Sequence, residues 1–349
     1  MSTTALSASA PDSVLCIDIG SRTQDALLFT RGETPANIPR MVLPSPPLLL
    51  ARRIAALTDA GLGVYLHGTL MGDGFIPALS RHLDAGRIAA MHPATADAFA
   101  ANGVALPAAL AREESCPENC SPLRTGDVDL SFWKTLCRHT GLELPLLVAV
   151  AARDLGGASG ETPGNMSVWR DTLFRAGKDG VPAETLMHSA APAGLARLAA
   201  IQSVTGGPVA DSGAAALLGL LSVRAIAERS HREGLLLINA GNSHITAFLV
   251  YRERVFGVYE HLTFGIDREQ RIKDFTDFRL GWLPGESVIA TGGRGCLFVE
   301  LPPEAEGFKA AYITGPQRDL LRGMGQMAAA FDDVAQTGCF GLLHGMGYI

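Results

Sequence analysis

Two segments of the sequence place polar side chains beside a glycine turn, and the first lies near the amino terminus. Between residues 15 and 25, an apolar run predicts a strand that ends near Asp18, followed by a turn and a second strand. The N–H groups of a glycine turn can surround a phosphate, and a carboxylate at the strand end could hold the hydration shell of Mg²⁺. An ordinary hairpin that uses Asp and Gly for its turn is an alternative explanation of this segment taken alone. The candidate site residues here are Asp18, Gly20, Ser21, Arg22, Thr23 and Gln24.

The second segment, residues 235–247, repeats this layout of apolar strand, polar residue, glycine turn, hydroxyl and strand. Two such turns can face one triphosphate. Asn239 stands where the first segment has Asp18, and an amide can bind water but cannot act as a base. The candidate site residues here are Asn239, Gly241, Asn242, Ser243 and His244.

Between the two turns, residues 208–221 predict the end of a strand followed by a helix of small residues. Such a helix can pack closely against a neighbouring helix, which suits a hinge between two lobes. Asp211 lies at the junction of strand and helix. Asp and Ser are favoured N-cap residues, so Asp211 or Ser212 could cap this helix. That role is compatible with a chemical role for the same carboxylate.

Towards the carboxyl end, residues 310–318 predict a strand that runs into a glycine turn and a helix, with Gly315 and Pro316 in the turn. A glycine at this place would let a purine approach the backbone. Residues 288–295 hold a rival glycine turn, but it lies farther from the last predicted helix, residues 332–343. We therefore expect the purine to lie against the turn at Gly315 rather than against the turn in residues 288–295.

The segments that must position these residues alternate between strands and helices along the chain. The pattern predicts a helix over 46–60, a strand over 63–67, a helix over 76–85 and a buried strand over 144–151, which indicates an α/β protein. The two hairpins suggest a duplication. Residues 111–129 and 154–165 show no periodicity, and we expect them to form binding loops on the substrate side.

The composition excludes several classes of protein. The 349 residues hold 35 acidic and 29 basic residues, and the charges are scattered, so nucleic acid is not an expected partner. No apolar run approaches the roughly 20 residues of a membrane span. Residues 1–13 lack the features of a signal peptide and are expected to form a disordered tail. The six sparse cysteines favour reduced thiols, so we expect a cytoplasmic protein.

The order of these segments resembles that of the superfamily that includes actin, the hexokinases and the heat-shock chaperone ATPases. The resemblance implies an α/β, two-lobed, ribonuclease H-like fold in which each lobe is a mixed sheet with flanking helices. It also implies that ATP and Mg²⁺ bind between the hairpins, with Asp18 positioning the metal through water and Gly315 and Pro316 supporting the adenosine. Sugar kinases of this group carry their base where this sequence has Asp211. The implied lobes are residues 14–230, with the first hairpin, substrate-side insertions and a connecting helix, and residues 231–349, with the second hairpin, the adenosine motif and a final connecting helix.

The resemblance implies an ATP-dependent phosphotransferase or ATPase acting on an unidentified small molecule. Because Asn239 replaces the usual Asp of the second phosphate motif, hydrolysis should be affected more than nucleotide binding. The alternative is a nucleotide-gated regulator, or an ATP-dependent activator that docks on a partner enzyme.

The chain also resembles an uncharacterised family labelled putative pyruvate formate-lyase activating enzyme, through residues 18–25, 41–46, 68–72, 260–261 and 337–343. Radical activases hold an iron–sulfur cluster with a Cys-x-x-x-Cys-x-x-Cys motif, whereas here Cys116 and Cys120 are followed by Leu123 in the third position. The pair could be two unremarkable thiols. It could also share a cluster with the same pair of a second subunit, which would make the protein a homodimer.

Overall fold

The computed structural model describes residues 11–157 and 164–349, and its strands form three sheets. The first sheet has the order β10-β8-β1-β2-β3. Its strands β1, β2 and β3 form an antiparallel meander, and β8 and β10 continue the sheet in parallel beyond β1. The bounds are β1 Ser13–Ile19, β2 Thr23–Thr30, β3 Arg40–Pro44, β8 Leu147–Ala152 and β10 Val209–Ala210.

The second sheet repeats this topology. Strands β11, β12 and β13 form the antiparallel meander, and β15 and β16 continue in parallel beyond β11. Two strands are added at the other edge, where β14 and the short β9 both pair with β13. The bounds are β9 Val181–Pro182, β11 Leu235–Ala240, β12 His244–Tyr251, β13 Arg254–Leu262, β14 Gly295–Phe298, β15 Ala310–Thr314 and β16 Gln326–Met327.

The same strand order in both sheets confirms the predicted fold class. A meander extended by two parallel strands beyond its first strand is the ribonuclease H-like arrangement, and it occurs twice in this chain. The fold is therefore an α/β, two-lobed, actin-like one, with a mixed sheet and flanking helices in each lobe. The duplication that the two hairpins suggested extends over whole sheets.

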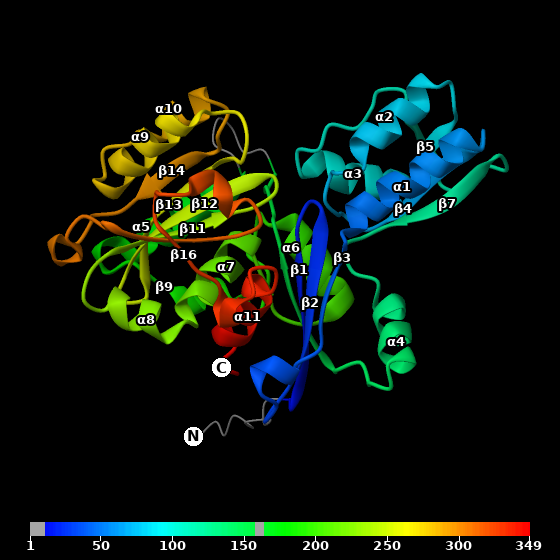
Figure 1. The fold of residues 1–349 in the computed structure, drawn as a ribbon. Helices are drawn as coiled ribbons and strands as arrows, with labels where there is room; N and C mark the ends of the chain where they lie inside the picture. Colours follow the sequence, from blue (N-terminus) through cyan, green and yellow to red (C-terminus); the bar gives the residue numbers. More distant parts are fainter. Residues whose placement is uncertain (1–10, 158–163) are drawn as a thin grey trace, which may run out of the picture.

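Two helices lie between the sheets, as Figure 1 shows: α7 (Ser212–Leu221) and α11 (Thr337–Gly345). Every residue of α7 from Gly213 to Leu221 is buried, which agrees with its uninterrupted small and apolar sequence. The helices cross so closely that a Cβ added to Gly341 would lie 1.8 Å from the Ala215 carbonyl oxygen. Glycine is therefore needed at the crossing, and the predicted close packing of this hinge helix is found.

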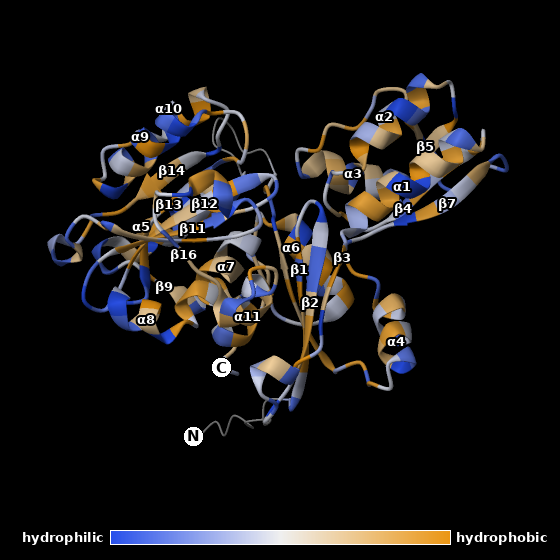
Figure 2. Ribbon diagram, in the orientation of Figure 1, coloured by the Kyte–Doolittle hydropathy of each residue, from blue (hydrophilic) through white to orange (hydrophobic). Residues whose placement is uncertain are grey.

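The remaining helices cover the sheets. In Figure 2, β14 is drawn largely in hydrophobic colours, whereas α8, α9 and α10 carry hydrophilic residues on their surfaces. None of the helices in the described ranges is long and apolar enough to cross a membrane. The bounds are α4 Leu130–His139, α5 Gly164–Ala176, α6 Ala196–Thr205, α8 Arg224–Ser230, α9 Arg268–Arg279 and α10 Gly285–Ala290, with short 3₁₀ turns at Pro35–Asn37, Gly177–Asp179, Ala183–Leu186, Pro303–Ala305, Arg318–Leu321 and Ala330–Asp332.

A third sheet is inserted between β3 and β8, and all of its strands are parallel in the order β6-β5-β4-β7. The prediction of a binding loop over residues 111–129 is wrong in its secondary structure, because β6 and β7 belong to this sheet. Strand β7 lies at the edge and is only partly buried, so its sequence lacks a clear period. The bounds are α1 Pro46–Asp59, β4 Gly63–Gly68, α2 Ile76–Asp84, β5 Ala89–Met91, α3 Pro93–Ala101, β6 Ala111–Arg112 and β7 Cys120–Thr125.

The chain passes between the lobes more than once. Helix α5 packs Trp169 against Phe248 of the second sheet, and β9 pairs with β13, although both α5 and β9 precede residue 230. The two lobes are therefore not divided at a single position. Of the predicted tail, residues 1–10 lie outside the described residues, and β1 begins at Ser13. Residues 158–163 of the predicted loop 154–165 also lie outside them.

Candidate functional site

A cavity of about 650 Å³ lies between the lobes. It is lined by both hairpin turns, the first residues of α7 and α11, the turn after β15, and the loop Gly72–Gly74 that follows β4 of the inserted sheet. The structure brings together most of the candidate residues that the sequence indicates. Those that line the cavity are Asp18, Gly20, Ser21, Arg22, Thr23, Asn239, Gly241, Asn242, Ser243, His244, Gly315 and Pro316.

The two turns have matching geometry. The Gly20 N–H donates to the Thr23 carbonyl over 2.8 Å, and the Gly241 N–H donates to the His244 carbonyl over 2.9 Å. Between these residues lie the pairs Ser21 and Arg22, and Asn242 and Ser243. Their backbone N–H groups donate no hydrogen bond to the described residues. Both turns thus keep free donors at the cavity, as phosphate binding requires.

The turns are held from behind in the same way. Ser45, directly after β3, donates its N–H to the Arg22 carbonyl over 3.0 Å, and Thr263, directly after β13, donates its N–H to the Ser243 carbonyl over 2.9 Å. These positions are equivalent in the two meanders. These two hydrogen bonds use carbonyl groups of the turns and fix the turn conformation. The N–H groups of the two central residues of each turn have no partner among the described residues, so they can bind a ligand. Ser45 and Thr263 were not singled out from the sequence, and only the strand pairing identifies them.

Asp18 lies at the end of β1, opposite Asp25 of β2. The Ser212 hydroxyl donates to Asp18 Oδ1 over 2.7 Å, and Gly338 of α11 is so close that an added Cβ would lie 2.0 Å from Asp18 Oδ2. Burial raises the pKa of Asp18 to about 7, and burial and then the Asp18 charge raise the pKa of Asp25 to about 8. Asp25 Oδ1 is buried without a hydrogen-bond partner in the described ranges.

These two carboxylates fit a divalent cation. They lie opposite each other across the hairpin and are partly buried, and desolvation is the largest cause of the raised pKa of each. Carboxylate oxygens are the ligands that Mg²⁺ prefers. Sequence reasoning missed Asp25, although its position in the second strand of the hairpin could have placed it opposite Asp18.

The second hairpin has no such carboxylates. Asn239 and Thr246 are paired across β11 and β12 as Asp18 and Asp25 are paired across β1 and β2. A Cβ added to Gly315, which has a φ of +96°, would lie 2.6 Å from Asn239 Oδ1 and 2.5 Å from the Ala240 carbonyl oxygen. The turn after β15 can therefore approach this hairpin only with glycine, in a conformation that favours glycine.

Two candidate residues do not line the cavity. Gln24 is buried, and its side chain donates to the Pro44 carbonyl over 3.1 Å, which links the ends of β2 and β3. Asp211 caps α7 by accepting from the Gly213 N–H over 2.8 Å, and its other oxygen accepts from the Asp154 N–H over 3.4 Å. The cap role of Asp211 is thus found, beside the cavity wall formed by Ser212 and Gly213.

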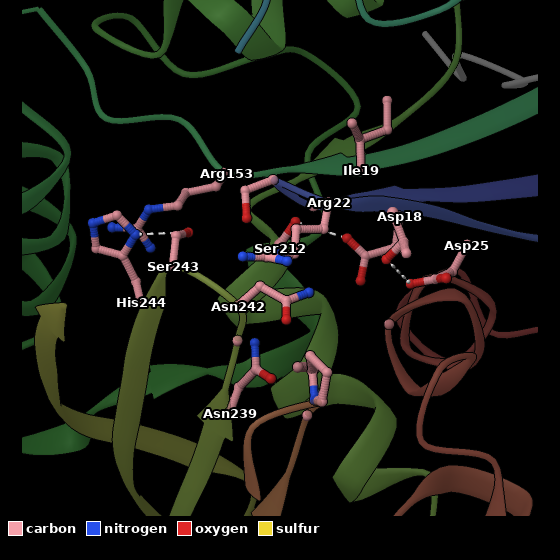
Figure 3. A pocket seen from close by; sticks show the side chains of 18 of the residues that line it. Asp18, Ile19, Arg22, Asp25, Arg153, Ser212, Asn239, Asn242, Ser243 and His244 are labelled. Carbon is pink, nitrogen blue, oxygen red and sulfur yellow. Dashed lines mark hydrogen bonds between the residues drawn. The ribbon is translucent and has the colours of Figure 1, made fainter. Parts of the chain in front are cut away.

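Arg153 is a cavity residue that the sequence did not indicate. It follows β8 in the first lobe and forms an ion pair with Glu260 of β13 in the second lobe. Figure 3 shows the Arg153 side chain extending toward Ser243 and His244. Burial and then the charges of Arg153 and Arg294 lower the pKa of His244 to about 2, so its imidazole is neutral.

Arg197 of α6 also lines the cavity and connects the first lobe to the inserted sheet. Its guanidinium donates to both oxygens of Asp127 over 2.8 Å. Asp127 follows β7 and also accepts from the Gly72 N–H over 3.4 Å. This buried pair positions the Gly72–Gly74 loop at the cavity, so the insertion forms part of the site wall.

Residues 71–320 match the model of the family described as "Putative pyruvate format-lyase activating enzyme (DUF1786)". The chain belongs to this family. Among curated proteins, no match was found.

Solved structures similar to this family member include proteins of several kinds. The ethanolamine utilization protein EutJ from Carboxydothermus hydrogenoformans is 7% identical over 96% of this chain and 90% of that chain, with a TM-score of 0.32. The inorganic polyphosphate/ATP-glucomannokinase from Arthrobacter sp. strain KM is 11% identical over 96% and 98%, with a TM-score of 0.33. A Ppx/GppA family member from Aquifex aeolicus is 12% identical over 78% and 61%, with a TM-score of 0.26. At these TM-scores the fold assignment rests on the strand order of the two sheets.

The cysteines of this DUF1786 member do not gather at one place. Cys116 is exposed, and its thiol lies 3.3 Å from the Cys120 carbonyl oxygen, while the other four cysteines are buried. In the described ranges, no three His, Cys, Asp or Glu side chains are arranged to hold a metal ion. Leu123 lies on β7 with Cys120, where a third thiolate would be needed. A cluster shared between two subunits stays a prediction.

Proposed function

We propose that this protein binds ATP with Mg²⁺ in the cavity between its lobes and transfers the terminal phosphoryl group to a small molecule or to water. The observation that carries this proposal is the pair of matching turns with free N–H groups, each held from behind by the residue after the third strand of its meander. Two such turns on opposite sides of one cavity suit a chain of phosphates.

The cavity residues divide into three groups by what they would hold. Asp18 and Asp25 would hold Mg²⁺, with Asp18 acting through water, and the metal would neutralise charge on the phosphates. The turns beginning at Gly20 and Gly241 would bind phosphate oxygens. Gly315, together with Pro316, would support the adenosine, because its missing Cβ lets the turn lie against β11.

Asp211 is the proposed base. Its carboxylate caps α7 beside Ser212, whose hydroxyl contacts Asp18, and it lies behind the cavity wall formed by Ser212 and Gly213. Phosphoryl transfer depends mainly on positioning and charge neutralisation, and one carboxylate that accepts the acceptor proton would complete the set.

A second function is favoured by the neutral pair Asn239 and Thr246. The second lobe offers no carboxylate opposite Asp18 and Asp25, so nucleotide could be held with little turnover. In that case the protein would be a nucleotide-gated regulator, or an activator of a partner enzyme, in which binding changes the closure of the lobes. Measured ADP release separates this function from the enzymatic one.

The proposed nucleotide site is tested by Asp18→Asn. Wild-type protein should be stabilised by ATP with Mg²⁺, by about 2.7 kcal/mol at a hundredfold excess of ligand over Kd. The variant should lose the part of this stabilisation that depends on Mg²⁺, because the amide cannot supply the carboxylate. It should still fold, since the amide is neutral at a partly buried position and can accept the hydrogen bond from Ser212.

Thermal unfolding with ATP, ADP or GTP, each with and without Mg²⁺, provides the measurement. Asp319→Asn is the matched control, because Asp319 is exposed and contacts Arg322 outside the cavity. If millimolar nucleotide with Mg²⁺ does not stabilise the wild-type protein, the proposed function is wrong and only the fold assignment stands.

A further inference from the structure

The cavity contains a cation placed beside the second turn. Arg153 comes from the first lobe, lines the cavity, and extends toward Ser243 and His244 of the second lobe (Figure 3). The backbone N–H groups of Asn242 and Ser243 in this turn donate no hydrogen bond within the described residues. A guanidinium and two free N–H groups thus face the same part of the cavity.

Arg153 has donors left over. Its partner is Glu260, whose side chain is 2% exposed, while the Arg153 side chain is 15% exposed. The Arg153 Nε is buried and makes no hydrogen bond to the described residues. A planar guanidinium matches the geometry of phosphate and carboxylate oxygens, and an unused buried donor is costly. A bound oxyanion would satisfy it once the side chain turns from Glu260 toward the second turn.

Glu260 keeps a second partner in its own lobe. The Asn165 side-chain amide donates to Glu260 Oε2 over 2.6 Å, and Asn165 Oδ1 accepts from Arg294 Nη2 over 2.9 Å. Glu260 is therefore held in place by the Asn165–Arg294 pair when Arg153 turns away. Arg153 lines the cavity, whereas Glu260, Asn165 and Arg294 do not, so Arg153 is the group among these four that can reach a cavity ligand.

We propose that Arg153 binds an oxyanion of the cavity ligand beside the second turn, in competition with Glu260. The oxyanion is the terminal phosphate of the nucleotide or an acidic group of the acceptor, since both present the same chemistry to a guanidinium. The site deepens the proposed function and rests on it for the identity of the ligand. The competition between Glu260 and an oxyanion for Arg153 can nevertheless be tested without nucleotide or metal.

The test uses inorganic phosphate as the probe, in buffer without Mg²⁺ or nucleotide. Phosphate should stabilise the wild-type protein against thermal unfolding. Glu260→Gln should bind phosphate at least about tenfold more tightly, because the competing carboxylate no longer occupies Arg153. The double variant Arg153→Gln/Glu260→Gln should lose the phosphate-induced shift. This double variant removes the charges of Arg153 and Glu260 together, so neither residue is left as an unpaired charge inside the protein.

The exposed pair Arg322 and Asp319 supplies the matched control, as the double variant Arg322→Gln/Asp319→Asn, which should keep the wild-type response. An equal phosphate shift in the wild type and the site double variant would overturn the proposal, as would unchanged affinity in Glu260→Gln. Because the phosphate response is measured without Mg²⁺ or nucleotide, failure of this site and failure of the metal-dependent nucleotide site are distinguishable.

The two sources of the oxyanion give different results with nucleotides. If Arg153 binds the terminal phosphate, the site double variant should lose affinity for ATP but not for ADP, both with Mg²⁺. If Arg153 binds the acceptor, the variant should keep both affinities, and wild-type protein saturated with ADP should still bind phosphate. Either result supports an oxyanion site at Arg153.

Discussion

Asp211 directly follows β10 and caps α7, and the same carboxylate is the proposed base. Asp211→Asn separates these roles. Asn caps helices about as well as Asp, so the free energy of unfolding should change by roughly a few tenths of a kcal/mol. Loss of a general base should lower the rate by about 10² to 10⁴. Both quantities can be measured, by urea unfolding and by ADP release.

The control for this substitution is Asp267→Asn. Asp267 caps α9 by accepting from the Gln270 N–H over 2.8 Å, and it lies outside the cavity lining. Asp267→Asn should change neither the free energy of unfolding nor the rate of ADP release by much. A folded Asp211→Asn protein with full activity would show that the carboxylate serves only as a cap.

His244 makes the stability depend on pH. Its pKa is about 2 in the folded protein, against an ordinary value of 6.5. Between these values the unfolded chain binds a proton that the folded chain does not, so stability falls as the pH falls below about 6.5. His244→Gln should remove up to about 1.4 kcal/mol of this loss per pH unit.

Urea unfolding at several pH values between 7 and 4 measures this slope. The exposed His139, at the end of α4, is the control, and His139→Gln should leave the slope as it is in the wild type. Equal slopes in His244→Gln and the wild type would contradict the assignment of His244 as a partly buried neutral imidazole.

At the scale of elements, the crossing of α7 and α11 predicts costs of different size for alanine at two glycines of one helix. Gly341 faces backbone, with an added Cβ 1.8 Å from the Ala215 carbonyl oxygen. Gly341→Ala should therefore destabilise the protein by about 1–3 kcal/mol or more. A Cβ at Gly345 would lie 2.9 Å from the end of the Leu218 side chain, which can move, and 3.2 Å from Met187 Cβ, so Gly345→Ala should cost less than about 1 kcal/mol.

Thermal and urea unfolding of the two variants give the comparison, and each serves as the control for the other. Alanine normally stabilises a helix relative to glycine, so helix propensity alone predicts a gain for both. A Gly341→Ala protein as stable as Gly345→Ala would mean that the helices do not cross as closely as the structure shows.

Helices and strands were predicted best from the sequence where the residues that define them are close together in the chain. The hairpins at Asp18 and Asn239 were predicted because strand, turn and strand are adjacent in the chain. The insertion was predicted less well, because the short β6 and the half-exposed edge strand β7 have no clear period. A parallel sheet of this kind is recognised through contacts between distant segments, which periodicity does not report.

At the scale of the whole molecule, most of the candidate site lies in one cavity because the same sheet is built twice and the two copies face each other across α7 and α11. The turn residues could be predicted from their own segments. Asp25 could have been placed opposite Asp18 from the register of their hairpin. Arg153 and Glu260 could not, since their pairing depends on the approach of one lobe to the other. Asp211 was predicted as a residue, but only the structure shows which hydrogen bonds its carboxylate makes.

The core of the first lobe joins segments from opposite ends of the sequence. Cys339 and Phe340 of α11 are fully buried in the same cluster as Val14, Cys16 and Ala149. During synthesis on the ribosome, β1 and β8 emerge long before α11, so this apolar surface stays uncovered until the last helix is made. A chain stalled earlier would present that surface to chaperones and to other nascent chains, which makes the first lobe the aggregation-prone part of the newborn protein.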